Sequence, residues 1–106
     1  MSTEKRKAAR FAISQFINIS YTKENFIKAT GINISIAGML CELDGTVEPY
    51  SKIFILLDLQ DKKDPVELEG IIVRIEKKGQ KYLAGVEFSD IYDEDKERLK
   101  KFIKTL

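Results

Sequence analysis

Histidine and tryptophan are absent from this chain of 106 residues, and cysteine occurs once. Without histidine, the commonest general base of enzymes and the commonest metal ligand are both missing. A single cysteine excludes an internal disulfide and, without histidine, a structural zinc site. The sequence also lacks a Walker-type phosphate loop and any apolar run long enough to span a membrane. We therefore expect a binding protein rather than an enzyme, with no metal, no cofactor and no membrane insertion.

The composition is typical of one globular domain, residues 1–106, with a single modest core. Hydrophobic residues make up 43% of the chain and charged residues 33%. Cys41 lies in the apolar run 39–41, so we expect it to be a small buried hydrophobic side chain. No apolar leader-like region follows the N-terminus, which makes a cytoplasmic location the expectation.

The charge is nearly balanced overall but uneven along the chain. The net charge is only +1, which argues against a general polyanion binder, so neither DNA nor RNA is expected as a partner. Residues 1–10, however, carry four basic side chains and one acidic side chain. This local excess predicts a flexible basic arm at the N-terminus.

Alternation of apolar and polar residues predicts a mainly β protein. The segment 80–88 shows the period of two most clearly, with Tyr82, Ala84, Val86 and Phe88 on one face. Residues 22–25 are predicted to form a hairpin turn, and Lys78-Gly79 another. The expected strands are residues 11–21, 26–33, 36–43, 52–60, 66–77 and 80–88.

The period changes to that of a helix near the C-terminus. Apolar residues recur at helical spacing (Leu99, Phe102, Ile103 and Leu106), after acidic residues and among lysines. Together the segments predict a six-stranded antiparallel β-barrel over 11–89, capped by a C-terminal α-helix over 92–105.

Two short motifs supply candidate binding groups. Arg6 and Arg10 lie four residues apart, and a guanidinium group can bond phosphate oxygens, or O6 and N7 of guanine, as a fork. Asn33 can both donate and accept at the edge of a base, and Ser35 adds a hydroxyl. Gly38 has no Cβ, which lets a ligand approach the backbone closely.

These motifs resemble those of the PilZ domain family, receptors for the bacterial second messenger cyclic di-GMP. The family signature R-x-x-x-R is matched by Arg6-Lys7-Ala8-Ala9-Arg10, and [D/N]-x-S-x-x-G by Asn33-Ile34-Ser35-Ile36-Ala37-Gly38. The segments 70–74 and 82–88 look like later strands of the family, followed by its C-terminal helix. The resemblance therefore covers nearly the whole chain, in the family's order.

The resemblance implies both a fold and a set of ligand contacts. The barrel would carry Asn33, Ser35 and Gly38 on its outer surface, where the first two hold a guanine edge. The arm bearing Arg6 and Arg10 would fold over the bound cyclic di-GMP and engage its phosphates and guanine bases.

Two positions depart from the commonest family pattern. Lys5 stands where members often have a first arginine, so a point charge replaces a fork. Asn33 stands where many members have aspartate, which leaves one acceptor oxygen instead of two. Lys5 and Arg74, the latter on a neighbouring strand, are secondary candidates for ligand contact.

Three functional interpretations remain open at this stage. The first is a receptor that relays cyclic di-GMP to an unknown downstream protein through ordering of the arm. The second is a degenerate PilZ adaptor that acts by protein–protein interaction without nucleotide. The third is a barrel that binds single-stranded nucleic acid, although this would need a wider basic groove with aromatic platforms.

Overall fold

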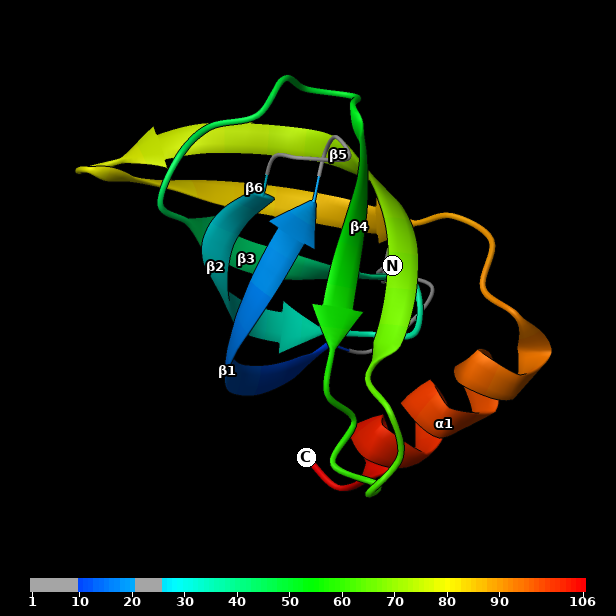
Figure 1. Ribbon diagram of the computed structural model, residues 1–106. Coiled ribbons are helices and arrows are strands. Elements are labelled where there is room, and N and C mark those ends of the chain that lie inside the picture. Colours follow the sequence, from blue (N-terminus) through cyan, green and yellow to red (C-terminus); the bar gives the residue numbers. More distant parts are fainter. Residues whose placement is uncertain (1–9, 21–25) are drawn as a thin grey trace, which may run out of the picture.

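The computed structural model describes residues 10–20 and 26–106, and the predicted turn at 22–25 lies outside these ranges. The described residues form six strands and one helix, as the sequence predicts (Figure 1). The elements are β1 (Phe11–Ser20), β2 (Phe26–Ile34), β3 (Gly38–Leu43), β4 (Lys52–Leu57), β5 (Val66–Lys78), β6 (Lys81–Phe88) and α1 (Asp93–Lys104).

The strands close into a barrel in the order β1-β2-β3-β6-β5-β4. Every neighbouring pair is antiparallel, and β1 meets β4 through the pairs Asn18–Leu56 and Ser20–Phe54 to complete the ring. Closure satisfies the backbone groups that an open sheet would leave unpaired at its edges. The predicted six-stranded antiparallel barrel with a C-terminal helix is therefore confirmed.

The barrel interior is filled by the apolar residues of the alternating pattern. Ile53, Ile55 and Leu57 of β4 are completely buried, whereas the side chain of Leu56 between them faces outward. Cys41 is also completely buried, as predicted, and burial raises the pKa of its thiol to about 12. The thiol is thus a core side chain and carries no reactive thiolate at neutral pH.

Three β-bulges lie in the strands and change which side chains face outward. They occur between Ala12 and Gln15 in β1, between Gly31 and Asn33 in β2, and between Ile72 and Arg74 in β5. A bulge bends its strand and redirects the next side chain. Asn33 and Arg74 each follow a bulge directly.

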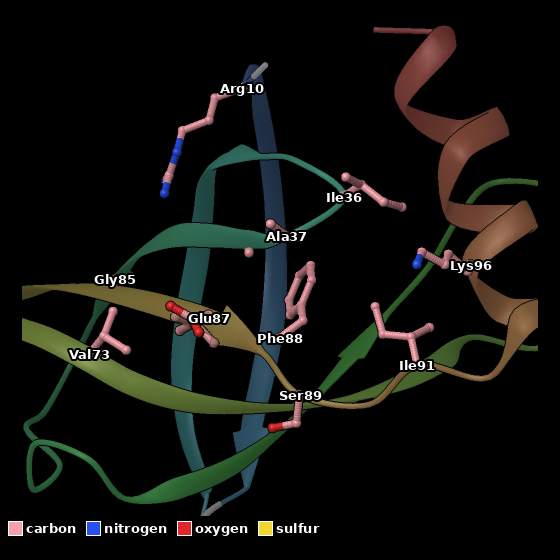
Figure 2. Close-up of a pocket in the computed structure, with 12 residues that line it drawn as sticks. Arg10, Ile36, Ala37, Val73, Gly85, Glu87, Phe88, Ser89, Ile91 and Lys96 are labelled. Carbon is pink, nitrogen blue, oxygen red and sulfur yellow. The ribbon is translucent and has the colours of Figure 1, made fainter. Parts of the chain in front are cut away.

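Strand β3 approaches β6 very closely where it begins. A Cβ atom on Gly38 would overlap the carbonyl oxygen of Val86 and come within 3.2 Å of its carbonyl carbon. Beside this contact the Phe88 backbone N–H donates to the Ala37 carbonyl at 2.8 Å, and Figure 2 shows both residues at this junction. Only glycine at position 38 allows this approach.

Helix α1 packs against the barrel through Leu99 and Phe102, which are both buried in the core cluster. Three acidic residues occupy its first turn and two lysines its last, which complements the helix dipole. The helical spacing also assigns Leu106 to this apolar face, and that prediction is wrong. Leu106 lies beyond the end of the helix and is 46% exposed.

Strand β4 ends at Leu57, three residues before the predicted end at Gln60, because the chain turns there. The Asp58 carboxylate accepts a hydrogen bond from the backbone N–H of Gln60 at 2.8 Å. Gln60 and Lys62 both adopt the left-handed conformation, with φ values of 58° and 65°. These turns are incompatible with a continuing strand.

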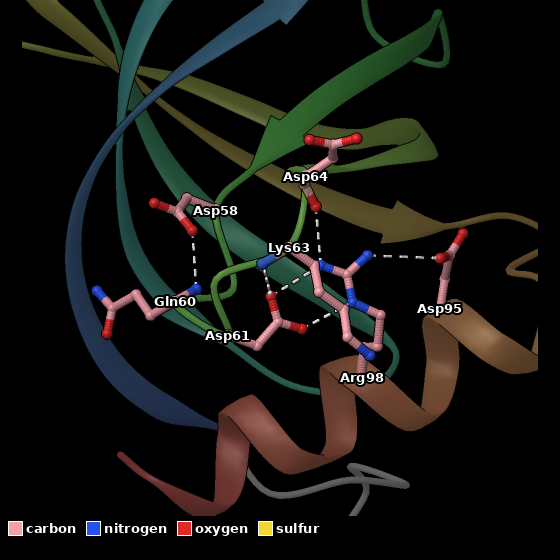
Figure 3. Close-up of polar contacts among 7 residues, drawn as sticks. All are labelled: Asp58, Gln60, Asp61, Lys63, Asp64, Asp95 and Arg98. Carbon is pink, nitrogen blue, oxygen red and sulfur yellow. Dashed lines mark hydrogen bonds and ion pairs between the residues drawn. The ribbon is translucent and has the colours of Figure 1, made fainter.

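The loop that follows β4 is tied to α1 by one arginine (Figure 3). Arg98 donates from Nε and Nη2 to the two carboxylate oxygens of Asp61, at 2.8 and 3.0 Å. Nη2 also donates to the backbone carbonyl of Asp64 at 2.8 Å, and Nη1 lies 4.0 Å from Asp95. This bidentate pair fixes the helix against the loop between β4 and β5.

We predict that Asp61→Asn lowers the melting temperature at pH 7, measured by circular dichroism. Hydrogen bonds from the Arg98 side chain, and then from the Lys63 backbone, lower the pKa of Asp61 from 3.8 to about 2. A depressed pKa in the folded state stabilises the fold above the unfolded-state pKa. The difference from the parent should therefore shrink as pH falls from 4 toward 2.

Asp64→Asn is the matched control, because residue 64 offers Arg98 a backbone carbonyl rather than its carboxylate. It should leave the melting temperature and its pH dependence unchanged. An equal loss in both variants would show that charge on the loop, rather than the Arg98–Asp61 pair, matters.

We also predict different effects on stability for two glycine substitutions. Gly38→Ala should lower the free energy of unfolding by about 1–3 kcal/mol or more, because β3 and β6 must separate. Gly85→Ala should leave it unchanged or slightly higher, since its Cβ would meet the Arg74 Cβ at an ordinary 3.7 Å. Urea unfolding measures both, and equal stability of the two variants would contradict the packing described.

Candidate functional site

The structure brings the ends of the two sequence motifs together. Arg10 donates from Nη1 to the side-chain oxygen of Asn33 at 3.1 Å, across 23 residues of sequence. Register explains the meeting, because Ala12 of β1 pairs with Asn33 of β2. The hydrogen bond is exposed, so both side chains remain within reach of a ligand.

Ser35 organises the turn between β2 and β3. Its side chain is buried, and its hydroxyl oxygen accepts from the backbone N–H groups of Ala37 and Gly38, at 3.0 and 3.2 Å. The Ser35 backbone N–H donates to the Gly38 carbonyl at 2.8 Å. The hydroxyl thus stabilises the turn through these hydrogen bonds. Its contact with a guanine edge stays a prediction.

Glycine at position 38 is also required by the packing of the barrel, which the sequence interpretation did not include. The space that its Cβ would need is occupied by the β6 backbone at Val86. The glycine therefore seats the turn on the barrel wall. Close approach of a ligand to its backbone stays a prediction.

A groove of about 590 Å³ opens beside this turn (Figure 2). It lies between Arg10, the turn, the outer side of β6 and the start of α1, with Val73 of β5 on its far side. The volume is in the range of small-molecule sites. Its lining residues are Arg10, Ile36, Ala37, Gly38, Val73, Gly85, Val86, Glu87, Phe88, Ser89, Ile91 and Lys96.

The groove combines apolar walls with a few charged groups. Phe88 and Val73 supply apolar surface, and Gly85, which pairs with Arg74 on the neighbouring strand, adds no side chain to the groove. Arg10 and Lys96 bring positive charge from two different elements, and Glu87 brings a carboxylate. Such a groove suits a flat ring system that carries both anionic groups and hydrogen-bond donors.

The predicted site residues fall into three groups relative to this groove. Arg10 and Gly38 line it. Asn33, Ser35 and Arg74 do not, although Asn33 bonds to Arg10, and Arg74 is exposed and pairs with the lining residue Gly85. Arg6 and Lys5 lie outside the described residues.

Sequence reasoning missed Gly85, Glu87 and Lys96. The alternation in β6 contained the signal for the first two, since residues 85 and 87 must face outward when residues 84 and 86 face the core. Lys96 had no comparable signal, because only the packing of α1 on the barrel brings its side chain to the groove.

Two negative findings apply to residues 10–20 and 26–106. Within these ranges no cluster of three or more metal-ligating side chains occurs. No helix there is both long and apolar enough to cross a membrane.

Comparison with solved structures shows that other proteins share this architecture. The PilZ domain of YcgR from Escherichia coli with c-di-GMP matches with a TM-score of 0.78 at 11% identity, over 97% of this chain and 92% of that chain. The MrkH–c-di-GMP complex from K. pneumonia matches with a TM-score of 0.75 at 11% identity, over 95% and 52%. At these identities the likeness establishes the fold.

The Bacillus subtilis inhibitor of motility, MotI/DgrA, matches with a TM-score of 0.78 at 19% identity, over 96% of this chain and 51% of that chain. The present chain thus spans about half the length of the MotI/DgrA and MrkH chains. No curated protein sequence gave a significant match. A sequence model of the PilZ domain matches residues 4–105, and the chain therefore belongs to the PilZ domain family.

Proposed function

We propose that this PilZ domain binds cyclic di-GMP in the groove beside the Ser35–Gly38 turn. The observation that carries the proposal is the meeting of Arg10, from the first motif, with Asn33, from the second. The structures of YcgR and MrkH with c-di-GMP, which share the fold, support it. We infer a nucleotide-binding role rather than an enzymatic one.

Arg10 is the first proposed ligand contact. Its guanidinium group has five N–H donors, of which one goes to Asn33 among the described residues, and we propose that others bond phosphate oxygens or O6 and N7 of guanine. Arg6 would add a second fork from the same motif, and Lys5 a point charge. The hydrogen bond to Asn33 holds Arg10 at the mouth of the groove before ligand arrives.

The guanine base is proposed to lie on the groove floor. Val73 and Phe88 offer apolar surface, and the absence of a side chain at Gly85 leaves room for a ring. The Glu87 carboxylate in the groove, and the amide oxygen of Asn33, which lies outside the lining but bonds to Arg10, are the proposed acceptors for the N–H groups of guanine. Arg74, which pairs with Gly85, is proposed to reach the same base from the neighbouring strand.

The relay to a downstream partner is proposed to follow from the arm. Charge-assisted hydrogen bonds from Arg6 and Arg10 contribute roughly 1.5–3 kcal/mol each. Ordering the residues that carry them costs about 1–2 kcal/mol per residue. A micromolar affinity, about −8 kcal/mol, is the expected balance. The ordered arm then offers a partner a surface that the free arm lacks.

We predict that calorimetric titration with cyclic di-GMP at moderate salt gives saturable binding by the parent protein. Arg10→Ala should weaken it by at least about tenfold, since one lost charge-assisted hydrogen bond costs about 1.5–3 kcal/mol. Lys28→Ala removes a cation from β2 outside the groove and should leave the affinity unchanged.

Controls with GMP and a short oligonucleotide separate the alternatives. Absence of binding to cyclic di-GMP would overturn the receptor proposal in favour of an adaptor that works without nucleotide. Tighter binding of the oligonucleotide than of cyclic di-GMP would favour a nucleic-acid-binding barrel. Normal binding by Arg10→Ala would show that the arm is not the clamp.

Lys96 gives a second, smaller prediction. Lys96→Gln should weaken cyclic di-GMP binding by up to about fivefold, because an exposed ionic contact contributes ~0.2–1 kcal/mol. The loss should diminish as salt is raised. Lys100→Gln is the matched control, since Lys100 lies on the same helix but pairs with Glu97 at 3.2 Å. Equal effects of both substitutions would show a general loss of positive charge.

A further inference from the structure

A second groove, on the outer face of β1, β2 and β4, exposes apolar side chains to solvent. Phe26 is 67% exposed and Leu56 is 48% exposed. Strand register brings them together, because Ser20 pairs with both Phe26 and Phe54, and Asn18 two residues away pairs with Leu56. These residues and Glu67 line a hollow of about 200 Å³.

A second hollow shares part of this lining and reaches the start of α1. Phe54 and Glu67 also line this second hollow, which has a volume of about 450 Å³ and ends at Tyr92. Tyr92 is 83% exposed and provides no side-chain cap to the helix, so packing of the domain does not account for its aromatic ring. The two hollows share Phe54 and Glu67 and are here together called the Phe54 groove. Its lining residues are Asn18, Ser20, Phe26, Phe54, Leu56, Glu67, Glu69, Asp90, Ile91, Tyr92 and Asp95.

We propose that the Phe54 groove is a docking surface for an amphipathic, positively charged segment of a partner protein. The inference does not depend on nucleotide binding, because the two grooves are almost separate. Among the described residues, the Phe54 groove shares only Ile91 with the groove proposed for cyclic di-GMP. Exposed apolar surface with a polar rim marks protein interaction sites.

The charge of the lining selects the occupant. Every charged side chain among the described residues that line the Phe54 groove is a carboxylate. Lys52 neutralises Glu69 only at 3.8 Å, and Arg98 reaches Asp95 only at 4.0 Å. A partner carrying lysine or arginine beside its apolar residues would be attracted, and an acidic one repelled.

The backbone of the barrel selects the mode of docking. Because β1, β2 and β4 are each paired on both sides, the groove offers no strand edge to which a partner strand could add. Recognition must rest on side chains, with apolar residues of the partner seated between Phe26, Phe54 and Tyr92. An amphipathic helix presents apolar and basic residues in that arrangement.

The test titrates the full chain with a synthetic amphipathic helix of about 15 residues made of leucine and lysine. Affinity is measured by fluorescence anisotropy, and the binding face by amide NMR shifts. We expect saturable binding with shifts confined to the groove. Tyr92→Ala, Leu56→Ser and Glu67→Lys should each weaken it by about tenfold or more.

Phe16→Ser is the matched control, because Phe16 is 90% exposed on β1 but does not line the groove, and it should bind like the parent. Equal loss in this variant, or equal binding of a peptide with glutamate for lysine, would overturn the proposal. A doubled molecular mass in light scattering that Leu56→Ser abolishes would also overturn it, since a second copy would then occupy the groove.

Discussion

The contact between β3 and β6 at Gly38 is the constraint on which the rest of the structure depends. The β6 backbone occupies the space that any larger residue would need, so the two strands can approach this closely only with glycine there. The same contact seats the turn that Ser35 holds through its hydroxyl. Closure of the barrel and formation of the groove wall are therefore one event. Ser35 and Gly38, which the sequence predicts as ligand contacts, first of all build the surface on which we propose that the ligand lies.

The domain separates its charge over two neighbouring grooves. Arg10 and Lys96 line the groove beside the Ser35–Gly38 turn, which suits a phosphate-bearing ligand. The charged residues that line the Phe54 groove are carboxylates. Both grooves reach the segment between β6 and α1, where they share Ile91. The Arg98–Asp61 pair holds the helix that follows this segment. A near-neutral protein can in this way offer one surface to an anion and another to a cation.

Much of the fold was predictable because it follows from local patterns. Alternation located the strands, and helical spacing located α1 with its buried residues Leu99 and Phe102. The end of β4 was not predictable from such patterns, because a side-chain hydrogen bond in the loop stops the strand there. Family resemblance alone implied that the two motifs serve one site, but the direct contact of Arg10 with Asn33 was not predicted and Lys96 could not be foreseen. Its position depends on how the helix packs, which no local pattern encodes.

The most direct test of the central claim is an NMR titration of the isotope-labelled chain with cyclic di-GMP. If the nucleotide lies in the proposed groove, the amide signals of Gly85, Glu87 and Asn33 should shift and saturate together. The signals of the outer face around Leu56 should stay in place. Shifts confined to that outer face, or no shifts at all, would contradict the account.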